Sequence, residues 1–319
     1  MVGSIYQRML LLILAAIIAA DCSWASLRKF DVDLQAYVPL AMLSAALGGA
    51  AVFYARVRRD EHLSAMLFGT AFLIAFSASF SMLNYFLLTI AGPRIDLQLA
   101  HVDRMLGFNW AFVMAIAAQH PLANAILRMA YSSVLPEIAL LIVWLGWSRM
   151  PDQIYKLCFA IAIGAAITVS FWTALPSFGA FSVYSLVPHV STQLSLALDS
   201  NYAHELVLML SNGPAQISPQ QAKGLIGFPS FHAALAVLVA WYGWSTPRLR
   251  WPLVILNTVV LFSTPIQGGH HLIDVLAGIA VAAVSVAAAY WLAQRLAHAN
   301  LSDSRAGPMA AVRRRFAES

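Results

Sequence analysis

Apolar residues fall into long uninterrupted stretches along this chain, and the polar residues collect between them. Eight such stretches stand out, at residues 9–27, 40–55, 63–90, 121–147, 155–174, 229–244, 252–265 and 272–296. A helix needs ~20 apolar residues to cross the ~30 Å hydrocarbon layer of a bilayer. Within the stretches apolar and polar residues do not alternate, as they would in the strands of a membrane barrel. The pattern therefore predicts an all-α protein, a polytopic transmembrane bundle of about eight helices.

Two of the stretches are open to a second interpretation. The first follows Arg8 and resembles a secretory signal peptide. Because Asp21-Cys22 is a poor cleavage site, we expect a retained helix, and removal is the alternative. The stretch at 252–265 is short, so a tilted or re-entrant segment is the alternative to a regular span there.

The connections between the stretches divide the chain. Residues 1–92 are expected to form N-terminal transmembrane helices, residues 93–296 a membrane domain, and residues 297–319 a basic cytoplasmic tail. The connections at 91–120 and 175–228 are longer than turns require, and loops of that length are usually functional or disordered. We expect 175–228 to fold as a periplasmic or luminal cap that contains a short helix.

Composition and charge indicate the environment and the orientation. The chain is 61% hydrophobic and 10% charged, whereas an ordinary soluble domain is ~25% charged. If the N-terminus is cytoplasmic and eight helices alternate, most lysines and arginines fall in the inner segments, as the positive-inside rule favours. We therefore expect both termini in the cytoplasm. The net charge of +5 comes mostly from this inner collar. It does not suggest nucleic acid, because no basic run is interleaved with exposed aromatic residues.

Two short polar constellations lie at the predicted outer ends of helices. The first, Gly227-Phe228-Pro229-Ser230-Phe231-His232, opens the sixth stretch, with Pro229 expected in the first helical turn. Free backbone N–H groups at a helix N-terminus bind anions, and the Ser230 hydroxyl adds a further donor. His232 is placed to exchange a proton with a bound anion. The alternative is a hydrogen-bonded interfacial histidine without a catalytic role.

The second constellation, at residues 263–274, precedes the last stretch. Gly268 and Gly269 allow close backbone approach just before the helix. His270 and Asp274 are four residues apart, and so lie on one helical face. A carboxylate so placed holds one imidazole nitrogen as N–H and leaves the other free as a nucleophile. A purely structural hydrogen bond would have the same spacing, but ionisable residues in membrane segments are costly and usually functional.

Together the constellations resemble the second and third signature motifs of the type 2 phosphatidic acid phosphatase superfamily, Pro-Ser-Gly-His and Ser-Arg-x5-His-x3-Asp. The matching residues are Pro229, Ser230, His232, Ser263, His270 and Asp274. The Phe-Pro-Ser-x-His sequence and the His-His pair look closer still to the inositol phosphorylceramide synthase branch. Weaker similarities to that branch lie upstream, at residues 103–110 and 175–178.

The resemblance implies a double displacement at a phosphate ester. His270 would attack phosphorus to form a phosphohistidine, with Asp274 orienting its imidazole. His232 would protonate the leaving alcohol and then activate the acceptor. Ser230 and Gly269 would help to hold the non-bridging oxygens, where negative charge accumulates. The resemblance implies no metal and no cofactor.

The phosphate-binding cations depart from the family pattern. Thr264 stands where the phosphatase pattern has an arginine, and no Lys-x6-Arg-Pro motif occurs upstream. The candidate replacements are Lys223, Arg104, Arg128 and His271. His271 lies three residues before Asp274 and is an alternative nucleophile, but His270 alone keeps the family spacing. Glu137, inside the fourth stretch, is either an orienting residue for the site or an interhelical polar contact.

We therefore predict an integral membrane lipid phosphotransferase that moves a phosphorylated headgroup onto a lipid alcohol such as ceramide or diacylglycerol. A phosphate monoester carries close to two negative charges, whereas a diester carries one. Because Thr264 stands in place of the family's phosphate-binding arginine, we expect diesters to be the preferred substrates. The alternatives are a lipid phosphate phosphatase of the same superfamily, a proton-coupled transporter, and a zinc site built from the three histidines and Asp274.

We expect a bacterial inner membrane protein with its site at the periplasmic face. The expected partners are a phospholipid or lipid phosphate, a lipid alcohol acceptor and the bilayer.

Overall fold

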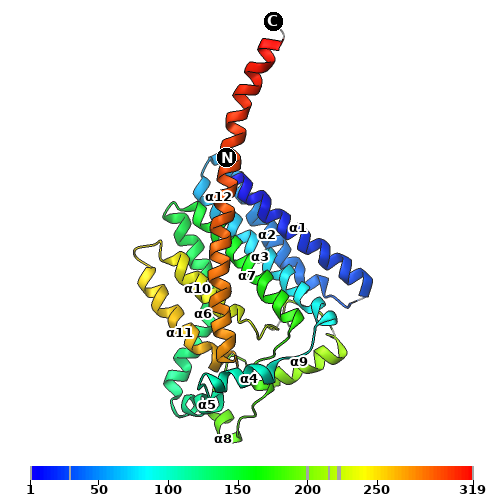
Figure 1. The fold of residues 1–319 in the computed structure, drawn as a ribbon, viewed down its shortest axis with the longest axis vertical. Helices are drawn as coiled ribbons and strands as arrows, with labels where there is room; N and C mark the ends of the chain where they lie inside the picture. The colour runs from blue at the N-terminus through cyan, green and yellow to red at the C-terminus, as the bar shows by residue number, and fades with distance from the viewer. Residues whose placement is uncertain (1, 29, 199–200, 215, 221–223, 318–319) are drawn as a thin grey trace.

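The computed structural model describes residues 2–28, 30–198, 201–214, 216–220 and 224–317, and these form a bundle of helices (Figure 1). All eight expected stretches are helical. They correspond to α1 (Val2–Arg28), α2 (Leu34–Phe53), α3 (Glu61–Leu87), α6 (Pro121–Trp147), α7 (Pro151–Ala174), α10 (Phe231–Gly243), α11 (Arg250–Gln267) and α12 (Leu272–Ala317). Extended backbone pairs within the described residues only at an isolated bridge between Val32 and Ile217. The predicted all-α bundle is confirmed.

Six helices in the described part of the chain are long and apolar enough to cross a membrane. They are α1, α3, α6, α7, the part of α12 up to Leu296, and α2 together with the π-helical turn η1 (Tyr54–Arg58) that continues it. The two remaining helices are shorter, with 13 residues in α10 and 18 in α11. The long apolar helices indicate an integral membrane protein. The stretch with the re-entrant alternative forms one continuous helix, α11.

Helix α7 is the centre of the bundle. It packs against α1, α3, α6, α10 and α12. In its most apolar window 61% of the residues are buried, against 6% in α2, which packs on α3 at the periphery. Leu157, Cys158 and Phe159 of α7 are fully buried. Helices α10 and α12, which the two sequence motifs precede, both pack on this buried central helix.

Both long connections contain helices. The first holds α4 (Asp96–Met105) and α5 (Trp110–Gln119), which were not predicted from the sequence, after the short turn η2 (Leu88–Ile90). The second holds η3 (Ala180–Ser182), α8 (Pro188–Gln193) and α9 (Asn201–Asn212), and α9 is the short helix expected in the cap. In Figure 1 α4, α5, α8 and α9 gather at the end of the bundle opposite to both termini.

Candidate active site

The beginnings of α10 and α12 meet at the capped end of the bundle. The Ser230 amide donates a hydrogen bond of 3.0 Å to the carbonyl oxygen of Asp274. One turn further along α12, a Cβ atom on Gly278 would lie only 2.3 Å from the Ser230 carbonyl oxygen. Only glycine permits this approach of the two backbones. The two sequence constellations therefore lie side by side, and Gly278, which was not singled out from the sequence, is the residue that allows it.

The helix start differs from the expectation at Pro229. Helix α10 begins at Phe231, and Ser230 is its N-cap, with its hydroxyl accepting a 3.3 Å hydrogen bond from the Ala233 amide. Pro229 precedes the helix, joined to Phe228 by a cis peptide bond. The prediction that Pro229 lies in the first turn is thus wrong. Serine is a favoured N-cap because its oxygen pairs with a free amide of the first turn, and this explains why the helix starts after Ser230.

His270 lies between Asp274 and Ser230. Its Nδ1 atom is 3.2 Å from Asp274 Oδ2, and its Nε2 atom is 3.4 Å from Ser230 Oγ. A carboxylate accepts hydrogen bonds, so Nδ1 carries the proton and Nε2 keeps a lone pair. Asp274 is fully buried and His270 is 6% exposed. The lone pair of Nε2 is therefore available in a site that excludes most water.

His271 faces the other way, toward α4. Its Nδ1 atom is 3.4 Å from Asp103 Oδ2, and its side chain is fully buried. Burial alone would lower the pKa of His271, but the carboxylates of Asp103 and Asp274 raise it above its ordinary value. The His271 amide also donates to Asp274 Oδ2 at 2.9 Å. His271 thus braces the carboxylate of Asp274.

Asp103 caps α12 from a distance in the sequence. Its Oδ2 accepts from the Leu272 amide at 2.8 Å and its Oδ1 from the Ile273 amide at 3.0 Å. A carboxylate pairs well with the free amides and positive dipole end of a helix. Asp103 is the first residue of the upstream segment at 103–110 that is similar to the family, and it fixes the backbone that carries His270.

His232 is held by an aromatic partner. Its Nε2 donates to the carbonyl oxygen of Tyr131 at 2.8 Å, and its ring stacks on the Tyr131 ring with centroids 3.9 Å apart. Because a carbonyl oxygen only accepts, Nδ1 is the nitrogen left for proton exchange. Tyr131 lies on α6, about a hundred residues away in the sequence, and no local pattern pointed to it.

The loop before α12 is fixed by backbone contacts with the cap. Gly269 has a φ of +63°, which favours glycine, and its carbonyl oxygen accepts from the Ala180 amide at 2.6 Å. The cap segment just before Ala180 is held by Asp96. The Oδ1 atom of Asp96 accepts from Ser177 Oγ at 2.9 Å and from the Phe178 amide at 2.7 Å. Gly269 and the 175–178 segment therefore act as parts of one loop assembly.

Neither of the two arginines proposed to bind phosphate lines the cavity that reaches His270. Arg104 is exposed on α4, and the exposed Arg128 donates to the hydroxyl of Ser195. Lys223 lies outside the described residues. Thr264 is fully buried, and its hydroxyl donates to the Val260 carbonyl oxygen of its own helix at 2.8 Å. The phosphate-binding roles of Arg104 and Lys223 stay predictions.

Glu137 makes an interhelical contact. Asn257 of α11 donates to its Oε2 at 2.6 Å, and Ser133, one turn earlier on α6, donates to its Oε1. Glu137 is buried, and it does not line the cavity that reaches His270. Of the two interpretations, the interhelical one fits these contacts.

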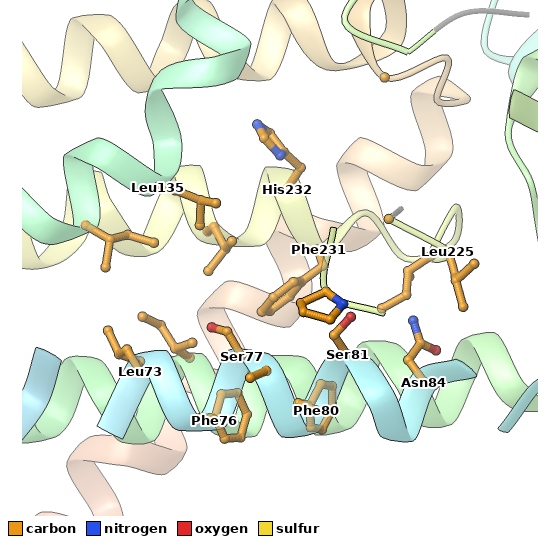
Figure 2. A pocket seen from close by; sticks show the side chains of 18 of the residues that line it. Leu73, Phe76, Ser77, Phe80, Ser81, Asn84, Leu135, Leu225, Phe231 and His232 are labelled. Atoms are coloured by element: carbon orange, nitrogen blue, oxygen red, sulfur yellow. The ribbon is translucent and has the colours of Figure 1, made fainter. Parts of the chain in front are cut away.

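A large cavity leads from the histidines into the bundle. It measures about 690 Å³, and its lining includes His232, His270 and Gly268 at the catalytic end. The rest of the lining is mainly apolar and comes from α2, α3, α6, α7, α10 and the cap. In Figure 2 α3 and α10 lie on opposite sides of the cavity, with Phe231 between them. In the described residues no lysine or arginine lines it. The described part of the chain also holds no group of three or more histidine, cysteine, aspartate or glutamate side chains arranged for a metal ion.

Comparison with known families identifies the superfamily of this chain. The sequence model of the PAP2 superfamily matches residues 97–288, more than half of the chain. The chain belongs to the PAP2 superfamily. Members act on phosphate esters as phosphatases or phosphotransferases, and the match spans α4 to α12, including both motifs. No curated protein and no solved structure matches the chain. Helices α1, α2 and α3 lie outside the matched residues.

Proposed function

We propose that this PAP2 protein is a lipid phosphotransferase that moves a phosphorylated headgroup onto a lipid alcohol through a phosphohistidine. The observation that carries the proposal is the placement of His270, whose Nε2 lone pair lies at the catalytic end of a large apolar cavity. In the first step Nε2 bonds to phosphorus while the bond from phosphorus to the leaving oxygen breaks. His232 gives that oxygen a proton. The geometry supports Ser230 as a donor to the phosphoryl group, because its hydroxyl lies beside Nε2.

In the second step the acceptor hydroxyl attacks the phosphohistidine. Its proton passes to His232, and the phosphorus–nitrogen bond breaks to restore His270. Asp274 stabilises the positive charge that the imidazole carries while it is phosphorylated, as the carboxylate of a catalytic triad does for its histidine. The residues named here need no metal for these steps.

The described lining of the cavity supports diesters over monoesters as substrates. A site that holds a monoester dianion gains most from fixed cations, and an arginine fork is the strongest of them. No arginine or lysine among the described residues lines the cavity, and Thr264 occupies the position of the family's arginine. This supports a phospholipid donor and a lipid alcohol acceptor of the ceramide or diacylglycerol type. It agrees with the similarity of the motifs to the inositol phosphorylceramide synthase branch.

The test compares two substrates in one purified preparation. We expect kcat/KM for a phospholipid diester, assayed with a lipid alcohol acceptor, to exceed that for a lipid phosphate monoester. The product should be the headgroup-bearing acceptor. If monoester cleavage is faster by an order of magnitude and no acceptor product forms, the chain is a lipid phosphatase.

We further propose that the capped end faces the periplasm of a bacterial inner membrane and that both termini are cytoplasmic. The termini lie at one end of the bundle and the cap at the other (Figure 1). The link between α2 and α3, whose sequence contains Arg58 and Arg59, lies at the end of the bundle away from the cap (Figure 1), which supports this orientation under the positive-inside rule.

Cysteine labelling tests the orientation. In a background with the exposed Cys22 replaced by serine, Ser211→Cys on α9 should react with a membrane-impermeant maleimide on intact spheroplasts. Ser304→Cys in the tail should react only after permeabilisation. The reverse pattern would place the site on the cytoplasmic side.

A further inference from the structure

Helix α3 presents a stripe of polar side chains to the cavity. Thr70, Ser77, Ser81 and Asn84 all line it. Their spacing of seven, four and three residues places them on one helical face. Figure 2 shows Ser77, Ser81 and Asn84 pointing from α3 into the space below Phe231. Polar side chains inside a membrane helix are costly and commonly mark a functional surface, and this surface lies outside the part of the chain that the PAP2 family model matches.

Asn84 is the buried member of this stripe. The side chain is 7% exposed, and in the described part of the chain its Oδ1 atom accepts no hydrogen bond. Leaving a buried acceptor unpaired destabilises the folded protein. A ligand that brings an N–H or O–H donor to this point of the cavity would remove that penalty.

The shape of the cavity fits a long aliphatic chain. From Thr70 to Asn84 the α3 wall extends about 21 Å, at ~1.5 Å per helical residue. The wall opposite and beside the stripe is apolar, with Leu73, Phe76, Phe80, Leu135 and Ile138. Each methylene group of a lipid chain that is buried against these walls increases the binding affinity. The apolar walls therefore provide affinity for the aliphatic chain of a lipid. The acceptor on Asn84 distinguishes lipids that carry an N–H or O–H donor from lipids that do not.

We propose that this cavity holds the lipid alcohol acceptor, with its aliphatic chain along α3 and an N–H or O–H group next to that chain donating to Asn84 Oδ1. The inference rests on the proposed function, because it assigns an occupant to the cavity of the same site. It makes Asn84 a specificity-determining residue. Chain recognition then lies on α3, apart from the motifs that perform the chemistry.

Photocrosslinking tests the occupant without requiring turnover. The probes are three lipid alcohols with the same diazirine-bearing chain: an N-acyl amino alcohol, its ester counterpart, and the same lipid with a hydroxyl in place of the amide. The labelled peptides should come from α3 and from the facing parts of α6 and α10. The donor-bearing probes should bind roughly 5- to 10-fold more tightly than the ester, the worth of about one hydrogen bond to an otherwise unpaired acceptor.

Two variants test separately the binding of the aliphatic chain of the lipid and the binding of its hydrogen-bond donor. Asn84→Leu should bring the donor-bearing probes down to the affinity of the ester. Ser77→Phe should fill the cavity and reduce labelling by all three probes at least tenfold. The matched control is Ser23→Phe, because Ser23 is exposed on α1 and does not line the cavity, and it should leave labelling unchanged. Elution profile and thermal unfolding identify any variant that fails to fold.

Two results would overturn the inference. One is labelling that Ser77→Phe and Ser23→Phe reduce equally. The other is wild-type protein that binds the ester as tightly as the donor-bearing probes. If the probes label α3 as expected but no headgroup transfer occurs in the substrate assay, the phosphotransferase proposal fails and the lipid site survives. If transfer occurs but the probes label other helices, the lipid site fails and the phosphotransferase proposal survives.

Discussion

The two ends of the cavity are built on different principles. At the catalytic end, the groups proposed to react have fixed polar partners: His270 contacts Asp274, His232 contacts the Tyr131 carbonyl, and two amides of α12 contact Asp103. Among the described residues, only Asp274 Oδ1 and the ring nitrogens of His271 lack a hydrogen-bond partner near these groups. At the α3 wall, the Oδ1 atom of Asn84 has no hydrogen-bond partner among the described residues, and the surroundings are apolar. Preorganised groups suit chemistry, because nothing needs to rearrange as charge develops. An unpaired acceptor suits recognition, because its partner arrives with the ligand.

The two ends of the cavity also differ in whether the PAP2 family model matches them. The catalytic end lies within residues 97–288, which match the PAP2 superfamily, whereas α3 lies outside them. We infer that the matched part supplies the reaction and that the N-terminal helices adapt it to a particular lipid. Changes at the catalytic end should therefore affect turnover far more than changes at α3, and the predictions below test this from the largest effect to the smallest.

The largest effect is expected at His270. His270→Ala removes the Nε2 lone pair, so the phosphoenzyme and all turnover should disappear. The measurement is trapping of an acid-labile, alkali-stable phosphoprotein from a headgroup-labelled phospholipid. His271→Ala is the matched control, because His271 faces Asp103 and does not line the cavity, and it should retain the phosphoenzyme. A phosphoenzyme lost only in His271→Ala would reassign the nucleophile.

His232→Ala comes next. A general acid contributes ~10²–10⁴-fold to the rate, so kcat should fall by that factor. The loss should be smaller for a substrate whose leaving group needs no protonation, such as a nitrophenyl phosphodiester. Tyr131→Phe is a useful companion, because it keeps both the stacking ring and the carbonyl that His232 contacts, and it should be close to wild type. Equal losses in His232→Ala for both substrates would argue against proton transfer by His232.

Much of this arrangement could be predicted from the sequence, and the rest could not for physical reasons. The bundle was predictable because continuous apolar stretches have few other structures open to them. The contact of His270 with Asp274 was predicted from their four-residue spacing and is present, but His270 lies in the loop before α12, which begins at Leu272, and not on a helical face. Asp103, Tyr131 and Gly278 are different. Their roles depend on which helices pack together, and a sequence shows periodicity within one helix but not the partner of its buried face. Helices α4 and α5 were missed because each has only 10 residues, too few to span a bilayer.

Gly278→Ala should have an intermediate effect. The added methyl group would lie 2.3 Å from the Ser230 carbonyl oxygen and 3.0 Å from Ala233 Cβ, so α10 and α12 must separate. A misplacement of ~1 Å at an active site can cost ~10²-fold, and we expect a loss of that order in kcat with the fold retained. The control is Gly49→Ala on α2, where an added Cβ meets nothing within 4 Å. Wild-type kcat in Gly278→Ala would show that the close approach of the two helices is not required.

The smallest effect on turnover is expected for Asp103→Asn, which should instead lower stability in a way that depends on pH. Asp103 accepts hydrogen bonds from two amides of α12, and the asparagine would replace one of its acceptor oxygens with a donor. We therefore expect a loss of about 1–3 kcal/mol in the free energy of unfolding.

The pH dependence comes from His271. Burial lowers the pKa of His271, but Asp103 and Asp274 together outweigh burial and raise this pKa above its ordinary value of 6.5. A group whose pKa is raised on folding stabilises the protein fully below its unfolded pKa and ceases to do so as the pH rises through its folded pKa. The difference in Tm between wild type and Asp103→Asn should therefore be largest near pH 6 and decrease toward pH 9, measured in one detergent at fixed ionic strength. In a His271→Gln background this pH dependence should vanish while the loss of the cap remains. A difference in Tm that is constant with pH would mean that Asp103 serves α12 as a cap alone.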